Sequence, residues 1–172
     1  MKKYLKFSGI VALVFALVAF ILMMACKSII HVDNSGTWYS GISAVFGGGK
    51  AALAGFEGDS SAKLAWTALI AWILILVAMV ILLAGIILPL LKVKALDKFA
   101  GVLNLVAVCA LIVGGILLFF TKPAFLGAND VDSDGFKYWK LGGGFVVAGI
   151  LAIIGGAFAI LPAAVDFVGK KK

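Results

Sequence analysis

The amino-acid sequence predicts an all-α protein, a four-helix transmembrane bundle that forms one integral membrane domain over residues 1–172. The stretch Leu64–Leu91 contains no charged residue, and its roughly 28 residues make about 42 Å of helix, longer than the ~30 Å hydrocarbon layer of a bilayer. Hydrophobic residues make up 64% of the chain and charged residues 13%, whereas soluble proteins have about 45–50% and 25%. Similar apolar stretches recur, so the predicted spans are about 7–30, 64–91, 99–120 and 141–168.

The connections between these spans are short. The larger outer loop, 31–63, is rich in glycine, and its segment Val45–Phe56 is either a short helix on the membrane surface or an irregular loop. The inner turn 92–98 is short enough to make the second and third helices antiparallel neighbours. The second outer loop is 122–140, and a lysine tail ends the chain.

The two halves of the chain show a faint internal repeat. Val32–Gly36 and Val131–Gly135 have similar sequences, and a pair of Trp and Tyr residues follows each. The sequence Ile-Leu-Pro occurs at 87–89 and again at 160–162, near the end of the second and fourth spans. This pattern favours a tandem repeat of two helical hairpins, and chance similarity of turn residues is the alternative.

The placement of charge orients the bundle. All fifteen basic residues are lysines, so the arginine fork used by nucleic-acid-binding proteins is absent and no nucleic-acid partner is expected. One side of the four-span arrangement carries nine lysines and two aspartates, and the other carries six lysines and six acidic residues. This positive-inside bias places both termini in the cytoplasm, and the Met-Lys-Lys start suggests a bacterial inner membrane. The inner lysines are expected to attract anionic lipid headgroups, beside the bilayer itself.

The first span allows a second interpretation. Its lysines, its apolar run and the segment Leu22–Cys26 resemble a bacterial lipoprotein signal that is cleaved before its cysteine. Cleavage there would lipidate Cys26 and leave three spans with the same orientation. The apolar run is longer than an ordinary signal segment, which favours an uncleaved span. Cys26 and Cys109 lie at different depths of their helices, so we expect no disulfide between them.

Small residues predict which helices pack closely, because lipid is as apolar as leucine and burying leucine cannot drive association. On the fourth span, Ala148, Ala152 and Gly156 repeat at intervals of four and form a smooth strip. Gly114 and Gly115 give the third span a matching gap. We therefore expect the third and fourth helices to pack along these five positions.

A candidate metal site lies in the second outer loop. Asp130, Asp132 and Asp134, followed by Gly135, match the first half of a calcium-binding loop, in which alternate acidic residues supply oxygen ligands. The resemblance to EF-hand loops covers only these six positions, and Leu141 stands where that family has a bidentate glutamate. Any calcium site is therefore expected to bind in the millimolar range. The alternative is an acidic turn whose carboxylates bond to backbone amides.

The sequence contains no pattern typical of an enzyme. His31 is the single histidine, and its neighbours in sequence do not provide the convergent groups that a catalytic triad needs. The spans also lack ionisable residues near mid-bilayer, where carriers place them. Asn104 is expected to hydrogen-bond between helices. We predict a protein that is not an enzyme and has no cofactor, apart from the calcium hypothesis.

The predicted function is that of a structural, scaffolding or accessory-subunit membrane protein, whose outer loops contact a membrane-protein partner or a second copy of the chain. Exposed aromatic residues favour interfaces, and the outer loops contain Trp38, Tyr39, Phe46, Tyr138 and Trp139. The alternative is a small-molecule or ion permease acting as an oligomer. Four spans, a larger first outer loop and cytoplasmic tails resemble the layout of claudins and tetraspan proteins. The claudin signature is missing beyond Trp38, so the family's adhesion role is an analogy only.

Overall fold

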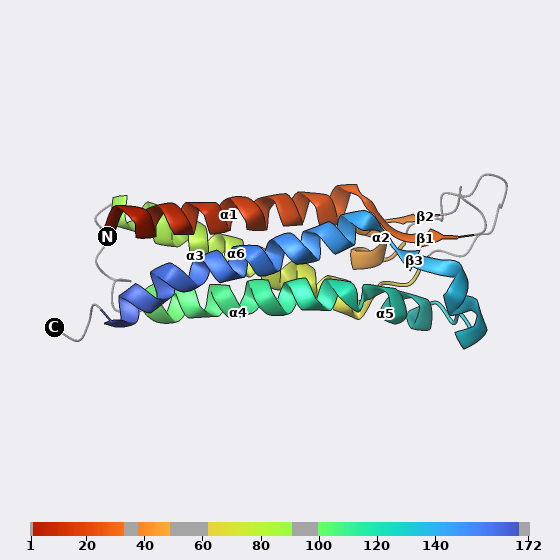
Figure 1. The fold of residues 1–172 in the computed structure, drawn as a ribbon. Coiled ribbons are helices and arrows are strands. Elements are labelled where there is room, and N and C mark those ends of the chain that lie inside the picture. The colour runs from red at the N-terminus through yellow and green to blue at the C-terminus, as the bar shows by residue number, and fades with distance from the viewer. Residues whose placement is uncertain (1, 33–37, 49–61, 91–99, 169–172) are drawn as a thin grey trace.

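The computed structural model describes residues 2–32, 38–48, 62–90 and 100–168. Four long helices lie side by side in it (Figure 1): α1 (Lys2–Ala25), α3 (Trp66–Leu90), α4 (Ala100–Phe119) and α6 (Gly143–Val168). Each has an apolar segment long enough to cross a bilayer, and these segments are Phe7–Ala25, Trp66–Ile87, Ala100–Phe119 and Gly143–Ala164. The predicted set of four membrane-crossing helices is confirmed among the described residues. The start of α1 and the end of α6 lie at the same end of the bundle (Figure 1).

The helix α6 holds the bundle together. It packs most extensively against α4 and α1, while α3 packs against α4 and makes a smaller contact with α1. The expected neighbours α3 and α4 are therefore in contact, although the inner turn 92–98 that joins them lies outside the described residues.

Alanines are common in the interior of the bundle, beside a few large side chains such as Ile75, Leu111 and Phe145, whereas many of the large apolar side chains point outward. Fully buried alanines occur on every long helix, and they include Ala12, Ala16, Ala19, Ala68, Ala71, Ala78, Ala107, Ala148, Ala152 and Ala159. Branched residues such as Val14, Val80 and Leu161 are more than half exposed. A protein surrounded by water would bury its larger apolar residues. Small residues inside and large ones outside suit helices that pack closely within lipid.

Three of the five predicted packing positions, Gly115, Ala152 and Gly156, lie between α4 and α6. A methyl group added at Gly115 would lie 2.7 Å from the carbonyl oxygen of Gly149, and one added at Gly156 would lie 3.3 Å from the carbonyl oxygen of Val108. Ala148 and Ala152 are fully buried, and Ala152 lies near Gly115.

Gly114 belongs to a different contact. A methyl group there would meet α3, 3.4 Å from the carbonyl oxygen of Ala71. Adjacent residues point about 100° apart around a helix with 3.6 residues per turn. Gly114 therefore faces α3, while Gly115 faces α6.

Gly156→Ala tests the α4–α6 contact. The added methyl group would lie 2.7 Å from Cγ1 of Ile112, a side-chain atom that can rotate away, so we expect a loss of about 1 kcal/mol in the free energy of unfolding. Gly9→Ala is the control, because no neighbouring atom lies within 4 Å of a methyl group added there. Unfolding titrations in mixed detergent micelles measure both variants. Equal stability of the two variants would contradict the packing contact.

At the end opposite the termini, the chain forms a small cap instead of two irregular loops (Figure 1). Its sheet contains β1 (Lys27–His31), β2 (Trp38–Ser40) and β3 (Trp139–Leu141) in the order β2-β1-β3, and both pairs are antiparallel. The predicted first span, 7–30, is therefore too long, since α1 ends at Ala25 and its last predicted residues form β1. The structure is mostly helical, as predicted, and its one described sheet is small, with the central strand β1 pairing with a strand from each loop.

Short helices complete the cap. They are α2 (Gly41–Phe46), α5 (Thr121–Ala128) and the 3-10 helix η1 (Ser133–Tyr138). The hydroxyl of Ser40 accepts a hydrogen bond from the backbone N–H of Ser43 at 3.1 Å and so caps α2. The expected surface helix Val45–Phe56 is described only to Gly48, and α2 already ends at Phe46. The tandem repeat stays a prediction, because most of its first copy lies at residues 33–37, outside the described ranges.

Candidate functional site

We define the cap as β1, β2, β3, α2, α5 and η1. Three of the five predicted contact residues, Tyr39, Tyr138 and Trp139, lie in one aromatic cluster of this cap. The ring of Tyr39 lies 4.8 Å from that of Phe125 and 5.9 Å from that of Trp139, between ring centroids. Trp139 in turn meets the ring of His31 edge-on at 4.8 Å, and His31 stacks on Tyr138 at 6.1 Å. Tyr39 and Trp139 are therefore partly buried within the cap, whereas Tyr138 is 40% exposed.

The other two predicted contact residues lie apart from this cluster. The ammonium group of Lys27 lies 4.8 Å from the ring centre of Trp38, a cation–π contact across the sheet. Phe46 is 48% exposed and meets Trp72 of α3 edge-on at 5.2 Å. Trp72 also lies 6.0 Å from Phe20 of α1. Phe46 therefore covers the cap end of the α1–α3 contact.

Burial raises the pKa of the Tyr39 phenol above its ordinary value, because the phenolate loses hydration in the cluster. The folded state therefore holds this proton more tightly than the unfolded state does. The resulting stabilisation is present below about pH 10, the ordinary tyrosine pKa, and is lost as the pH rises through the raised value. Tyr39→Phe should remove the latest-ionising component from the phenolate absorbance titration. Loss of a component that ionises near the ordinary tyrosine pKa, with the latest component retained, would show that Tyr39 is accessible to water.

Asn129 joins the two connecting loops, a role that sequence analysis missed. Its side-chain oxygen accepts a hydrogen bond from the backbone N–H of Lys63 at 2.8 Å, and its amide nitrogen donates to the carbonyl oxygen of Lys63 at 3.1 Å. The same nitrogen donates to the carbonyl oxygen of Phe125 at 2.8 Å. The side chain of Asn129 thus fastens the segment before α3 to the end of α5. A single Asn within the predicted loop 122–140 gives no sign of such a distant partner.

Asp130, the next residue along the chain, also contacts Lys63. Its carboxylate forms an ion pair with the Lys63 ammonium group at 2.5 Å, and both side chains are well exposed. Asp132 and Asp134 are exposed at the start of η1. Within the described ranges, no three acidic, His or Cys side chains come together as a metal ion would require. Calcium binding at Asp130, Asp132 and Asp134 stays a hypothesis that titration with the metal can decide.

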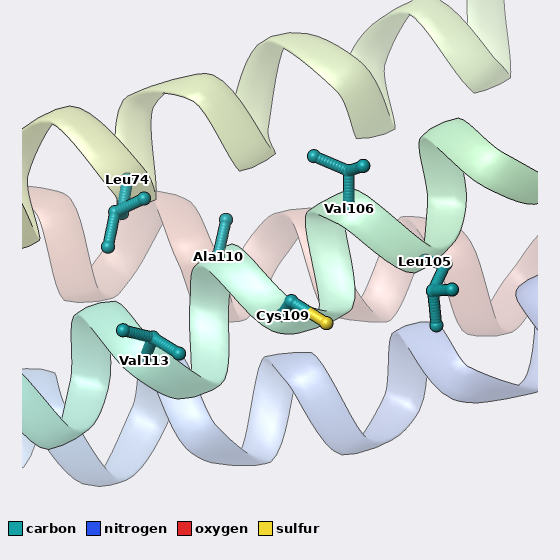
Figure 2. A pocket seen from close by; sticks show the side chains of 6 residues that line it. All are labelled: Leu74, Leu105, Val106, Cys109, Ala110 and Val113. Carbon is teal, nitrogen blue, oxygen red and sulfur yellow. The ribbon is translucent and has the colours of Figure 1, made fainter.

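The membrane-crossing part of the bundle has an apolar hollow on its outer surface, between α3 and α4. Its volume is about 330 Å³, and its lining residues are Leu74, Leu105, Val106, Cys109, Ala110 and Val113. Figure 2 shows Leu74 extending from α3 beside Ala110 of α4. The exposed side chains of Leu105, Val106 and Val113 place the opening on the lipid-facing side. Apart from the Cys109 thiol, no lining side chain has a polar group.

No acidic, basic or histidine residue occurs in the four membrane-crossing segments. The polar side chains that the structure does bury lie mostly near helix ends, such as Ser8 and Thr121. Carriers and proton pathways place ionisable groups at depth. Among the described residues, many of the polar and charged side chains therefore lie in the cap. No protein-family profile, curated protein or solved structure matches the chain.

Proposed function

We propose that this chain is a non-enzymatic membrane protein of the structural, scaffolding or accessory-subunit type, and that its cap binds a partner on the outer side of the membrane. The observation that carries the proposal is the construction of the cap. Both connecting loops contribute to one sheet around β1, and Asn129 fastens them together. A preformed surface of this kind binds a partner without a large cost in ordering.

The proposal includes the orientation of the chain in the membrane. The excess of lysine at the end that carries both termini supports a cytoplasmic position for that end, with the cap outside a bacterial inner membrane. The same lysines would hold anionic lipid headgroups. A cysteine introduced at Lys94 should resist a thiol reagent that does not cross membranes, and one introduced at Gly48 should react. The reverse labelling pattern would invert the topology.

Purification in a mild detergent tests the proposed partner binding. A stoichiometric membrane-protein companion, or a defined self-association, should accompany the full-length chain. Exposed aromatic residues of the cap are the expected contacts, so Phe46→Ala and Tyr138→Ala should reduce the recovered partner. Phe7→Ala is the matched control, because Phe7 is also well exposed but lies near the opposite end of the bundle. Equal loss with Phe7→Ala, or no companion at all, would count against the proposal.

A permease acting as an oligomer is the alternative function. The interior of one bundle is filled by buried apolar side chains, many of them alanines, so a pathway would have to run between copies. Flux of small ions or solutes into liposomes that contain only the purified chain would support this alternative and replace the proposal.

The lipoprotein alternative would separate α1 from the cap. Cleavage before Cys26 would cut the chain between α1 and β1, where the Cys26 backbone N–H donates to the carbonyl oxygen of Leu22 at 3.1 Å. The backbone N–H of Gly41 also donates to the carbonyl oxygen of Cys26 at 3.0 Å. Intact mass measurement should therefore give the uncleaved, unlipidated chain. A mass lacking residues 1–25 and carrying acyl groups would establish processing instead.

A further inference from the structure

The helix α6 contains a proline within its membrane-crossing segment, at Pro162. Proline has no backbone N–H, so the carbonyl oxygen four residues earlier, on Phe158, receives no hydrogen bond from its own helix. An unpaired carbonyl group is unfavourable in hydrocarbon, where no water can replace the missing donor. The carbonyl group of Phe158 therefore needs a donor from elsewhere.

Ser8 of α1 supplies this donor. Its hydroxyl group donates a hydrogen bond to the carbonyl oxygen of Phe158, across 150 positions of sequence. Ser8 is buried, with only 6% of its surface exposed. Ser8 thus bonds to the one carbonyl group that Pro162 leaves without an intrahelical partner.

The two helices are in close contact beside this hydrogen bond. The rings of Phe15 and Phe158 stack with centroids 5.8 Å apart. A methyl group added at Gly155 would lie 3.3 Å from the carbonyl oxygen of Ala12. The contact therefore fixes the position of α6 just before Phe158, whereas the turn from Phe158 to Pro162 lacks one of its own hydrogen bonds.

We propose that Pro162 makes the inner end of α6 a hinge, and that the hydrogen bond from Ser8 is the latch that holds this end against α1. When the latch is broken, the segment after the proline swings away from α1, and the carbonyl group of Phe158 gains water or lipid headgroups as partners. The cap end of the two helices does not move, because close packing holds them there. A methyl group at Gly144 would overlap the side chain of Cys26.

Spin labels on the full-length chain in lipid nanodiscs test the hinge. Labels of the inner pair replace Ile10 of α1 and Ala164 of α6, an exposed position after Pro162, in a background where Cys26 and Cys109 are alanine. A control pair at Val18 and Ile150, also exposed, reports the part of the contact nearer the cap. The labelled chain that keeps Ser8 and Pro162 should give one narrow distance distribution for each pair of labels.

Ser8→Ala should add a longer distance for the inner pair and leave the control pair unchanged. Ser8→Thr keeps a hydroxyl group and should restore the narrow distribution. The double variant Ser8→Ala with Pro162→Ala should also restore it, because the N–H of residue 162 then bonds to the Phe158 carbonyl oxygen.

Three results would overturn the proposal. They are an unchanged inner distance in Ser8→Ala, equal broadening of the control pair, and broadening that persists in the double variant. If Ser8→Ala alone does not fold, the double variant must recover folding. Failure of that recovery would equally rule out the latch.

Discussion

Gly142→Ala is expected to lower the free energy of unfolding by at least about 3 kcal/mol, or to prevent assembly of the cap. A methyl group at this position would overlap the carbonyl group of Lys27 and lie 3.1 Å from the carbonyl oxygen of Ser28. Both obstacles are main-chain atoms of β1, so no change of rotamer can relieve the overlap. The Gly142 N–H also donates to the Ser28 carbonyl oxygen at 2.6 Å. The substitution therefore forces β3 and the start of α6 away from β1.

Gly143→Ala is the matched control for this experiment. No neighbouring atom lies within 4 Å of a methyl group at Gly143, and its backbone φ is not positive. Unfolding in mixed detergent micelles compares the two variants with the unmodified chain. A loss of about 3 kcal/mol corresponds to a drop of roughly 6–12 °C in the unfolding midpoint for a chain of this size. Equal stability of Gly142→Ala and Gly143→Ala would mean that β1 and α6 are not in this contact.

The sequence predicts the four long helices well and the cap poorly, because the cap depends on contacts between distant segments, such as the contact of Gly142 with β1. Lipid requires a membrane-crossing helix to be long and apolar throughout, and this requirement is local to each segment. The bounds of the second, third and fourth predicted spans differ from those of α3, α4 and α6 by at most two residues, as at Trp66 and Ala100. The strand β1 depends instead on partners at Trp38–Ser40 and Trp139–Leu141. Nothing in Lys27–His31 alone distinguishes five residues of strand from the last turn of a helix.

The predicted contact residues of the outer loops could likewise be recognised from the sequence only in part. Aromatic residues in the loops could be recognised from their type, but their contacts could not. Tyr39 and Trp139 lie partly inside the cap's own aromatic cluster, whereas Phe46 and Tyr138 present more surface. The cluster is centred on rings from both loops, including Phe125 of α5, which is almost fully buried. Only the pairing of β1 with β2 and β3 brings these rings together.

Asn129→Ala is expected to cost about 2 kcal/mol of unfolding free energy, because it removes three hydrogen bonds at once. Two of them hold the backbone of Lys63, and the third holds the carbonyl oxygen of Phe125. Hydrogen exchange should quicken at the Lys63 amide and at the Ala65 amide, which bonds to the carbonyl oxygen of Ala44 at 2.8 Å. The segment before α3 would then be released from α5.

Asp130→Asn separates the amide contact from the neighbouring ion pair. Asp130 has a positive φ of 57°, a conformation that asparagine adopts readily, so this variant removes the charge without straining the backbone. The Lys63 and Asp130 side chains are 62% and 80% exposed, and we expect the lost ion pair to cost less than about 1 kcal/mol. That cost should shrink further in high salt, whereas the cost of Asn129→Ala should not. A larger, salt-dependent loss in Asp130→Asn would mean that charge, and not the neutral amide of Asn129, fastens the two loops. If the amide dominates, the surface proposed for partner binding keeps its shape when the ionic strength changes.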